Sequence, residues 1–165
     1  MQTAGAIEIT VSPLRDQSEA EFCAGFIVSS DPWLTLRLPY HHALQRLCDP
    51  AREVYLAQVK DQIAGVLILH LGGSFSGYIQ TLAVHPVWRN RGVGTKLVQF
   101  AEQRMFRESP NVFLCVSSFN DRAQKLYQRL GYERAGELPD YVVKGYSEIL
   151  MRKTRGPLSD FKPGA

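Results

Sequence analysis

The segment Arg89-Asn90-Arg91-Gly92-Val93-Gly94-Thr95 carries the residue types of an anion-binding loop. Glycines at positions 92 and 94 allow a ligand to approach the backbone closely. A helix that begins here offers free N–H groups and a partial positive charge, and Arg89 and Arg91 add formal charge. This combination is typical of a pyrophosphate site. The competing interpretation is an ordinary helix start that contains glycine and has basic neighbours.

Two better-known phosphate motifs fit the same segment poorly. A Walker loop would end in Gly-Lys-Ser or Gly-Lys-Thr, whereas here Lys96 follows Thr95. A dinucleotide fingerprint would need a third glycine at position 97, which is Leu97. The elements on either side of the loop must therefore decide what it binds.

Those elements predict an α/β protein of α+β type. Asn120 is a good N-cap for one helix, and Gly131 is suited to follow the C-terminus of that helix. Three consecutive strands come before the helix that starts at the loop, which implies a mixed sheet. We expect strands at 7–11, with Pro13 ending the first, 53–60, 63–71, 78–84, 112–116, 132–136 and 145–153, helices at 16–27, 40–47, 92–107 and 121–130, and a turn at 61–62.

Composition limits the class of protein. The 165 residues suffice for one domain, which we place at 1–155, with a loose tail at 156–165. Apolar residues make up 45% and charged residues 21%, as in soluble globular proteins. Neither a secretion signal nor a membrane span is expected. Three widely spaced cysteines fit a reducing cytoplasm, and a net charge of +3 is too small for a nucleic-acid binder.

The flanking motifs resemble the acyl-CoA signature of the GNAT superfamily of N-acetyltransferases. The pattern Arg-x-x-Gly-x-Gly follows the run Leu82-Ala83-Val84-His85-Pro86. A second signature comes later, with Asn120, then Tyr127, then Leu130-Gly131-Tyr132. The resemblance is strong over residues 78–153 and elsewhere extends only to the order of elements. It implies a GNAT fold, with a mixed, mostly antiparallel twisted sheet of six to seven strands flanked by about four helices.

The resemblance also implies which residues hold acetyl-CoA. Backbone groups of Leu82, Ala83 and Val84 would pair with the pantetheine arm as an added strand would. An N–H in this stretch, that of Leu82, would polarise the thioester carbonyl. Asn120 would hydrogen-bond the pantetheine arm. The pyrophosphate would bind the loop, whose backbone N–H groups come from Asn90, Arg91, Gly92, Val93, Gly94 and Thr95, with Arg89 nearby.

Proton transfer is expected at both ends of the reaction. The amine must lose a proton before it attacks, and a lysine amine has a pKa of about 10.4 against about 8 for an α-amine. The leaving thiolate needs a proton, and Tyr127 matches the acid of the family. Asn120 and Tyr127 are seven residues apart and share one helix face. Packing in the core is the alternative role for Tyr127.

The base is less well defined by the sequence. Some amino-terminal acetyltransferases of the superfamily have Glu or His five residues before the matching Asn, and here that residue is Cys115. We therefore expect Tyr78 to act as a base through water, because its strand resembles that of certain eukaryotic amino-terminal acetyltransferases. Packing on the sheet is the alternative. Gln80 would hold the water, and Glu148 would either reach the acceptor or be an exposed strand residue.

The acceptor is predicted only as a primary amine. Candidate contacts are Trp33, Tyr40, Gln80, Tyr141 and Glu148. The acceptor is a protein or peptide amino terminus or, alternatively, a small amine such as a polyamine, amino acid or antibiotic. A non-catalytic acyl-CoA-binding or interaction module is the alternative of another class. No metal, nucleic-acid or membrane partner is expected, and the protein would be a monomer or homodimer.

Overall fold

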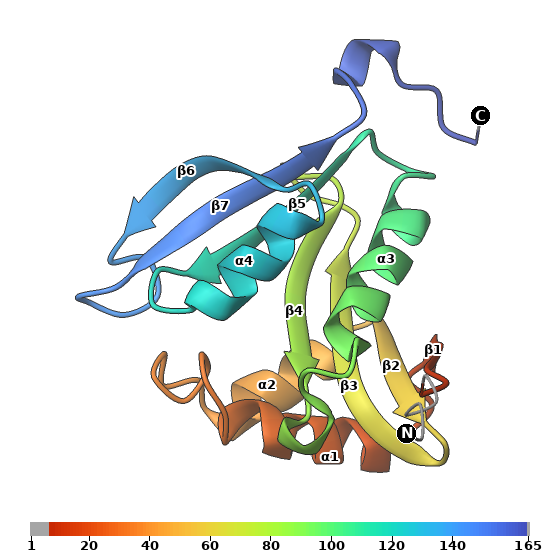
Figure 1. The fold of residues 1–165 in the computed structure, drawn as a ribbon, viewed down its shortest axis with the longest axis vertical. Coiled ribbons are helices and arrows are strands. Elements are labelled where there is room, and N and C mark those ends of the chain that lie inside the picture. Colours follow the sequence, from red (N-terminus) through yellow and green to blue (C-terminus); the bar gives the residue numbers. More distant parts are fainter. Residues whose placement is uncertain (1–6, 165) are drawn as a thin grey trace, which may run out of the picture.

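The computed structural model describes residues 7–164 of the chain. Seven strands form one sheet and four α-helices pack on it (Figure 1). The elements are β1 (Thr10–Pro13), α1 (Gln17–Val28), α2 (Tyr40–Leu47), β2 (Glu53–Val59), β3 (Gln62–His70), β4 (Tyr78–Val84), α3 (Val93–Met105), β5 (Asn111–Ser117), α4 (Asp121–Arg129), β6 (Glu133–Pro139) and β7 (Ser147–Thr154), with 3-10 turns at Pro86–Trp88 and Leu158–Asp160.

The strand order is β1-β2-β3-β4-β5-β7-β6. Every neighbouring pair is antiparallel except β4 and β5. Helix α3 makes the crossover between these two parallel strands, as a parallel connection requires. The expected α/β fold, with a mixed and mostly antiparallel sheet and four helices, is confirmed.

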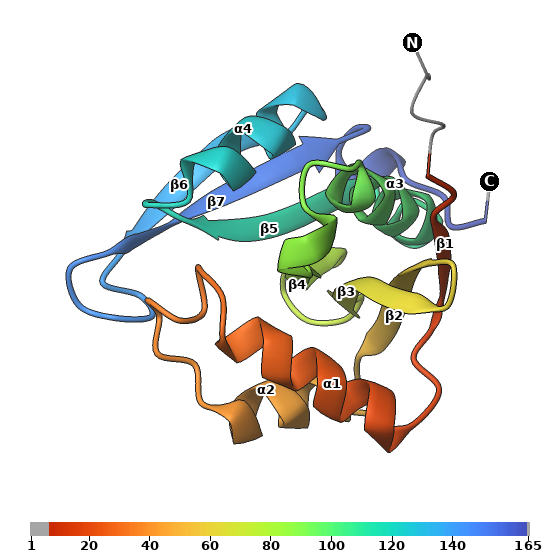
Figure 2. The ribbon, with the colours of Figure 1, turned by 60° about the horizontal axis from the view of Figure 1, so that its bottom comes forward.

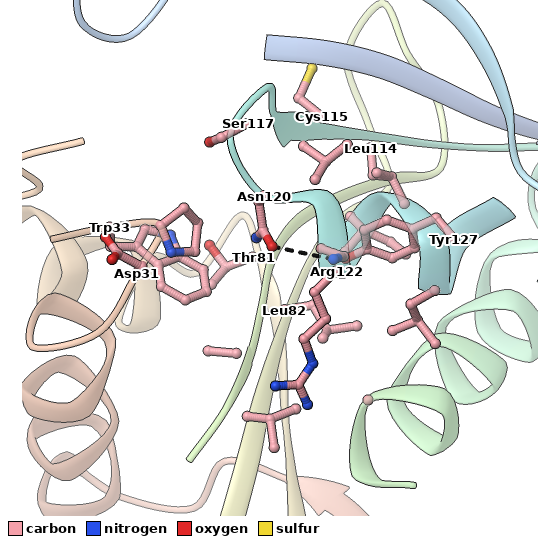
Figure 3. Close-up of a pocket in the computed structure, with 18 of the residues that line it drawn as sticks. Asp31, Trp33, Thr81, Leu82, Leu114, Cys115, Ser117, Asn120, Arg122 and Tyr127 are labelled. Carbon is pink, nitrogen blue, oxygen red and sulfur yellow. Dashed lines mark hydrogen bonds between the residues drawn. The ribbon is translucent and has the colours of Figure 1, made fainter. Parts of the chain in front are cut away.

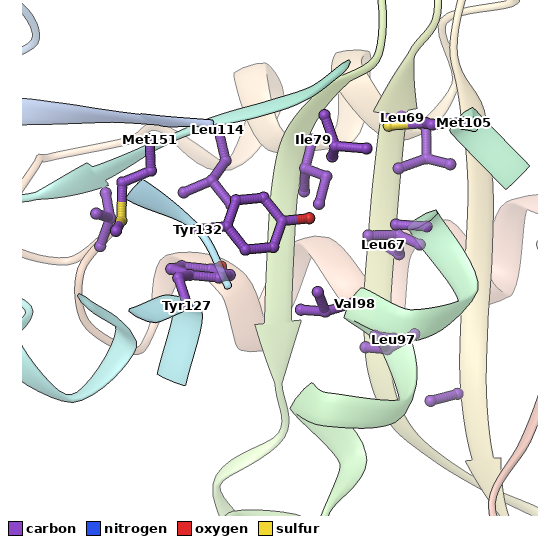
Figure 4. Packing of buried hydrophobic residues seen from close by; sticks show 14 of the residues in the cluster. Leu67, Leu69, Ile79, Leu97, Val98, Met105, Leu114, Tyr127, Tyr132 and Met151 are labelled. Atoms are coloured by element: carbon purple, nitrogen blue, oxygen red, sulfur yellow. The ribbon is translucent and has the colours of Figure 1, made fainter. Parts of the chain in front are cut away.

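The helices cover both faces of the sheet. Helices α1 and α2 lie on one face, and α3 and α4 lie on the other (Figure 2). The larger apolar cluster joins the sheet to α3 and includes Leu67, Leu97 and Met105 (Figure 4). A second cluster joins the sheet to α1 and α2 and includes Ile27 and Leu56. The central strand β3 is buried on both faces, as its continuous apolar run predicts.

Several predicted boundaries were wrong by a few residues, mainly near the sheet edges. The first strand spans Thr10–Pro13 rather than 7–11, and Pro13 belongs to it. A proline is tolerated there because β1 is an edge strand and pairs only with β2. The turn predicted at 61–62 occurs at 60–61, where Lys60 has a φ of +54°. The last two strands begin at Glu133 and Ser147.

Among residues 7–164, no helix is long and apolar enough to cross a membrane. The three cysteines are free thiols. After β7 the chain forms the 3-10 turn at Leu158–Asp160, and the N–H of Gly164 donates to the carbonyl of Arg107 at 3.4 Å.

Candidate active site

The main cavity opens where strands β4 and β5 separate. The two strands pair at only two positions, Tyr78 with Phe113 and Ile79 with Leu114. Beyond Ile79 the two strands are no longer paired, and a cavity of about 770 Å³ lies there. This volume is within the usual range for a small-molecule site. The cavity runs from the loop before α3 to the loops beside β7, so it has two chemically different ends.

One wall of the cavity is the free edge of β4. The N–H of His85 donates to Ala64 of β3, and the carbonyl of Ala83 also faces β3, where it lies 2.9 Å from a Cβ placed on Gly65. Because a strand alternates its backbone groups, Leu82 and Val84 direct theirs toward the opening. The carbonyl of Val84 there accepts from Arg89 Nε at 3.4 Å.

A bulge changes the direction of β4 just before this edge. Ile68 and Leu69 are adjacent on β3 but pair with Thr81 and Ile79, so Gln80 is the extra residue. Bulges are common beside active sites because they redirect side chains. The Gln80 side-chain carbonyl accepts from Arg52 Nε at 3.0 Å. The amide nitrogen of Gln80 and the second lone pair of its carbonyl oxygen are therefore free to hold a water or substrate.

The glycine loop forms the second wall. Gly92 is the N-cap of α3, with a φ of +85°, and gives the helix no side-chain cap. The hydrogen bond from the N–H of Lys96 to the carbonyl of Gly92 is the first one of the helix. The N–H groups of the first helical turn, which come before Lys96, are therefore free. A Cβ on Gly92 would meet nothing within 4 Å, so the approach to these groups is open. This geometry suits an anion.

Helix α4 brings Asn120 and Tyr127 to the same cavity (Figure 3). Asn120 is the N-cap predicted, since its Oδ1 accepts from Ala123 N at 3.2 Å. Tyr127 is 7% exposed and packs edge-to-face on Tyr132 at 5.7 Å (Figure 4). Among residues 7–164 its hydroxyl has no hydrogen-bond partner, and burial raises its pKa to about 12. The phenol therefore stays protonated at neutral pH.

The other end of the cavity is lined by side chains of strands β4, β5 and β7. Tyr78, Cys115 and Glu148 line it, and burial raises the pKa of all three side chains. Tyr78 and Cys115 also interact with each other. The expectation of an exposed Glu148 was wrong, because this residue is 6% exposed. It is buried because it pairs with Ser117 across β5 and β7 and accepts from Ser117 Oγ at 2.7 Å.

Two loops enclose this end. Trp33 comes from the α1–α2 connection and Tyr141 from the β6–β7 connection, as proposed from the sequence. In Figure 3, Trp33 and Asp31 lie across the cavity from Tyr127. Sequence reasoning missed six other lining residues, which come from the same loops and from helix α2, because no motif marks them as site residues: Asp31, Pro32, Leu36, Leu38, Arg46 and Val142.

Two predicted site residues do not line the cavity. Tyr40 is exposed at the start of α2. The Arg91 guanidinium lies over the Trp88 ring, at 5.2 Å from its centre.

A contact missed by sequence reasoning is Arg122 of α4, which lines the cavity and donates to Asn90 Oδ1 at 2.6 Å. This bond ties the loop to α4.

The donor end fits an extended acyl thioester with a pyrophosphate. The unpaired edge at Leu82 and Val84 offers hydrogen bonds to an amide-bearing arm, and the open N-terminus of α3 offers donors to phosphate. Gly94 lies between them, where a Cβ would make ordinary contacts with Leu126 at 3.4 Å and Val84 at 3.6 Å. Within the described residues, no three His, Cys, Asp or Glu side chains form a metal-binding group.

Comparison with known families agrees with this geometry. The family model described as the Acetyltransferase (GNAT) family matches residues 16–132, which is most of the chain. The chain belongs to the GNAT acetyltransferase family. Members of this family use acetyl-CoA, and the chain is an N-acetyltransferase of this class.

Individual GNAT relatives match this chain over different shares of their length. N-alpha-acetyltransferase RimI of Mycobacterium tuberculosis is 28% identical over 162 residues, with 93% of this chain and 98% of that protein covered. An uncharacterized protein of Mycobacterium leprae is 36% identical over 91 residues, which cover 54% of this chain and only 25% of that protein. The chain therefore spans a quarter of one relative and nearly all of the other.

Solved GNAT structures share the fold. Arabidopsis thaliana NAA60 in complex with a bisubstrate analogue has a TM-score of 0.74 at 16% identity, covering 89% of this chain and 98% of that one. An aminoglycoside 6'-N-acetyltransferase complexed with coenzyme A has a TM-score of 0.73 at 17% identity, covering 90% and 98%. At these identities the likeness concerns the fold alone, so the acceptor has to be argued from the cavity.

Proposed function

We propose that this N-acetyltransferase moves the acetyl group of acetyl-CoA to the α-amine of a peptide or protein. The observation that carries the proposal is one continuous cavity with two ends. The donor end is built from backbone groups, at Leu82, Val84 and the start of α3. The acceptor end is built from aromatic and aliphatic side chains above a single buried carboxylate, Glu148.

At the donor end, the pantetheine arm pairs with the free edge of β4, and the pyrophosphate binds the N–H groups from Asn90 to Thr95. The Leu82 N–H, on that edge, polarises the thioester carbonyl as an oxyanion donor. The amide nitrogen of Asn120 is free to contact the arm, because its oxygen caps α4. Arg89 contributes charge near the phosphates, while Arg91 packs on Trp88.

Tyr127 hydrogen-bonds the sulfur as the C–S bond breaks and supplies its proton. The hydroxyl has no partner among the described residues, so it is available to the leaving group. Tyr78 contributes differently. Because burial raises its pKa well above the usual value for a phenol, Tyr78 stays neutral and holds the amine or a water without ionising.

The lining of the acceptor end favours a peptide over a polycation. Trp33, Leu36, Leu38, Tyr141 and Val142 present apolar surface, which suits the first side chain of a peptide. An aminoglycoside or polyamine carries several ammonium groups and would need several free carboxylates. Here the two acidic residues are Glu148 and Asp31; Asp31 accepts from the N–H and hydroxyl of Thr35, and Arg46 adds positive charge.

We also propose residues 1–155 as the catalytic domain and 156–165 as a tail, although 1–6 and 165 lie outside the described residues. The relative RimI is bacterial, and free thiols suit a reducing compartment, so we propose the cytoplasm as the site of action. A monomer or homodimer, acting without metal or nucleic acid, is part of the same proposal.

An acceptor panel tests the proposed function. The purified chain is incubated with acetyl-CoA and peptides that begin with Ala, Ser, Met, Lys or Asp, with the same peptides blocked at the amino terminus, and with spermidine and kanamycin. Thiol release and the mass of each product are measured. We expect acetylation of free α-amines and none of the blocked peptides.

Other outcomes of the panel select the alternatives. Transfer confined to spermidine or kanamycin would replace the peptide acceptor with a small amine. Acetyl-CoA binding by calorimetry without transfer to any acceptor would favour a non-catalytic acyl-CoA module. Neither result depends on which side chain removes the proton from the amine.

A further inference from the structure

The acceptor end contains a buried carboxylate that the donor chemistry does not use. Glu148 is 6% exposed and lines the cavity. Within the described residues it forms no ion pair, and its one side-chain partner is the Ser117 hydroxyl at 2.7 Å. A carboxylate without a cation is costly to bury, because it loses hydration that a single hydrogen bond does not replace. Such a group is well placed to receive a cationic ligand.

The register of the sheet places this carboxylate beside the position where a base is missing. On β5, Cys115 and Ser117 are two residues apart and therefore lie on the same face. Ser117 pairs directly with Glu148, and Cys115 pairs with Leu150, also on β7. Glu148 therefore lies on the same face of the sheet as Cys115, beside Ser117, which is the next residue of β5 on that face. Its charge is close enough to raise the pKa of both Cys115 and Tyr78.

The groups that face Glu148 do not compete for a proton at neutral pH. Tyr78 of β4 and Cys115 of β5 both have raised pKa values because they are buried, so they remain neutral. Tyr141 lines the cavity from the β6–β7 loop. Across the cavity, Asp31 is held by Thr35 in the α1–α2 connection, and Arg46 of α2 carries no proton-accepting group.

We propose that Glu148 takes the proton from the acceptor ammonium and that Ser117 positions it, an assignment that rests on the proposed N-acetyltransferase function. The acceptor ammonium binds as a cation against the Glu148 carboxylate and gives it one proton. The free amine then attacks the thioester carbon, a C–N bond forms and the C–S bond breaks. The nitrogen loses a second proton to solvent, the thiolate gains one from Tyr127, which solvent reprotonates, and Glu148 passes its proton to solvent, so that one proton in total is released.

The experiment compares pH profiles of kcat/KM for wild type, Glu148→Gln, Glu148→Asp and Ser117→Ala. The probe is the peptide of the acceptor panel that wild type acetylates fastest. Glu133→Gln, an exposed strand residue, is the matched control. Acetyl-CoA affinity by calorimetry and thermal melting show that each variant folds and binds the donor.

We expect Glu148→Gln to lower kcat/KM at pH 7 by about 10-fold, because an α-amine of pKa about 8 is only about one-tenth free at that pH. The deficit shrinks as the pH rises past the α-amine pKa of about 8, because solvent then supplies the free amine. Glu148→Asp restores part of the activity. Ser117→Ala moves the acidic limb of the profile to higher pH, because the carboxylate loses a hydrogen bond to its charged form.

The two levels of the proposal fail in different ways. An unchanged pH profile and kcat/KM in Glu148→Gln, with a wild type that acetylates the peptide, would overturn the role of Glu148 alone. A loss that is equal at every pH would assign Glu148 to binding or structure and would also overturn it. A wild type that binds acetyl-CoA but acetylates no amine would overturn the proposed function and, with it, this assignment.

Discussion

Tyr127→Phe removes a single oxygen atom from the centre of the cavity. The ring remains packed edge-to-face on Tyr132, at 5.7 Å between centroids. The lost hydroxyl has no hydrogen-bond partner among residues 7–164, so no partner is left unsatisfied. We therefore expect the free energy of unfolding to change by less than about 1 kcal/mol. The effect should appear in the chemical step.

The size of that effect follows from the acidity of the two groups. Burial raises the pKa of Tyr127 to about 12. A thiol has a pKa of about 8.5, so complete proton transfer from this phenol to a free thiolate is uphill. Tyr127 therefore lowers the barrier chiefly through a strong hydrogen bond to the developing charge, and it passes its proton to sulfur only as solvent replaces that proton. Such a bond contributes roughly 1.5–3 kcal/mol, so kcat should fall about 10- to 150-fold.

The assay measures kcat with the best peptide acceptor and the Kd of acetyl-CoA by calorimetry. We expect the Kd to stay within about twofold, because the hydrogen bond matters mainly in the transition state. Tyr132→Phe is the matched control, since its hydroxyl is buried and does not line the cavity. An unchanged kcat in Tyr127→Phe, or equal losses in both variants, would refute the role of the hydroxyl.

Substitutions at three further positions test other parts of the structure. Gly92→Glu should abolish acetyl-CoA binding in calorimetry, whereas Gly92→Ala, which shares the backbone strain at a φ of +85° but adds no charge and meets open space, should bind more tightly than Gly92→Glu; equal Kd values would contradict the phosphate site. Gly65→Ala brings a Cβ within 2.9 Å of the Ala83 carbonyl and 3.0 Å of Leu97, so urea unfolding should show a loss of about 1–3 kcal/mol. Because burial raises the pKa of Glu148, its ionised form lowers stability above the unfolded pKa of about 4.3. Glu148→Gln should therefore raise the melting temperature at pH 7 but not at pH 4, and a lower melting temperature at pH 7 would contradict this.

The parts of the fold predicted best are those with local signals. The bounds of α2 and β4 were confirmed as predicted, and both elements lie next to prolines, at 39 and 86. Asn120 caps α4 and Gly131 has the expected positive φ of +91°. Edge elements were less predictable. The limits of β1 and β6 depend on which residues find partners in β2 and β7, and no local pattern encodes that choice.

Glu148 shows why periodicity alone could not define the acceptor end. The run from Ser147 to Thr154 alternates between an apolar face toward α3 and a face toward the cavity. A cavity-lining face contains polar residues even where it is buried. From the sequence, such a face is identical to one exposed to solvent. The difference arises because β7 pairs with β5 and the loop that contains Tyr141 lines the same cavity.

The two ends of the cavity therefore differ in how the chain encodes them. In the proposed site, acetyl-CoA is held mainly by backbone groups, which require glycine, a helix start and an interrupted strand pair in one stretch of sequence, so a short motif suffices to predict the donor. The acceptor end is assembled from side chains of the α1–α2 connection, β4, β5 and β7. Substitutions at Trp33 or Tyr141 can then change the acceptor without disturbing the phosphate loop. On this argument, substitution of Trp33 or Tyr141 should alter the KM for peptides and leave the Kd of acetyl-CoA unchanged.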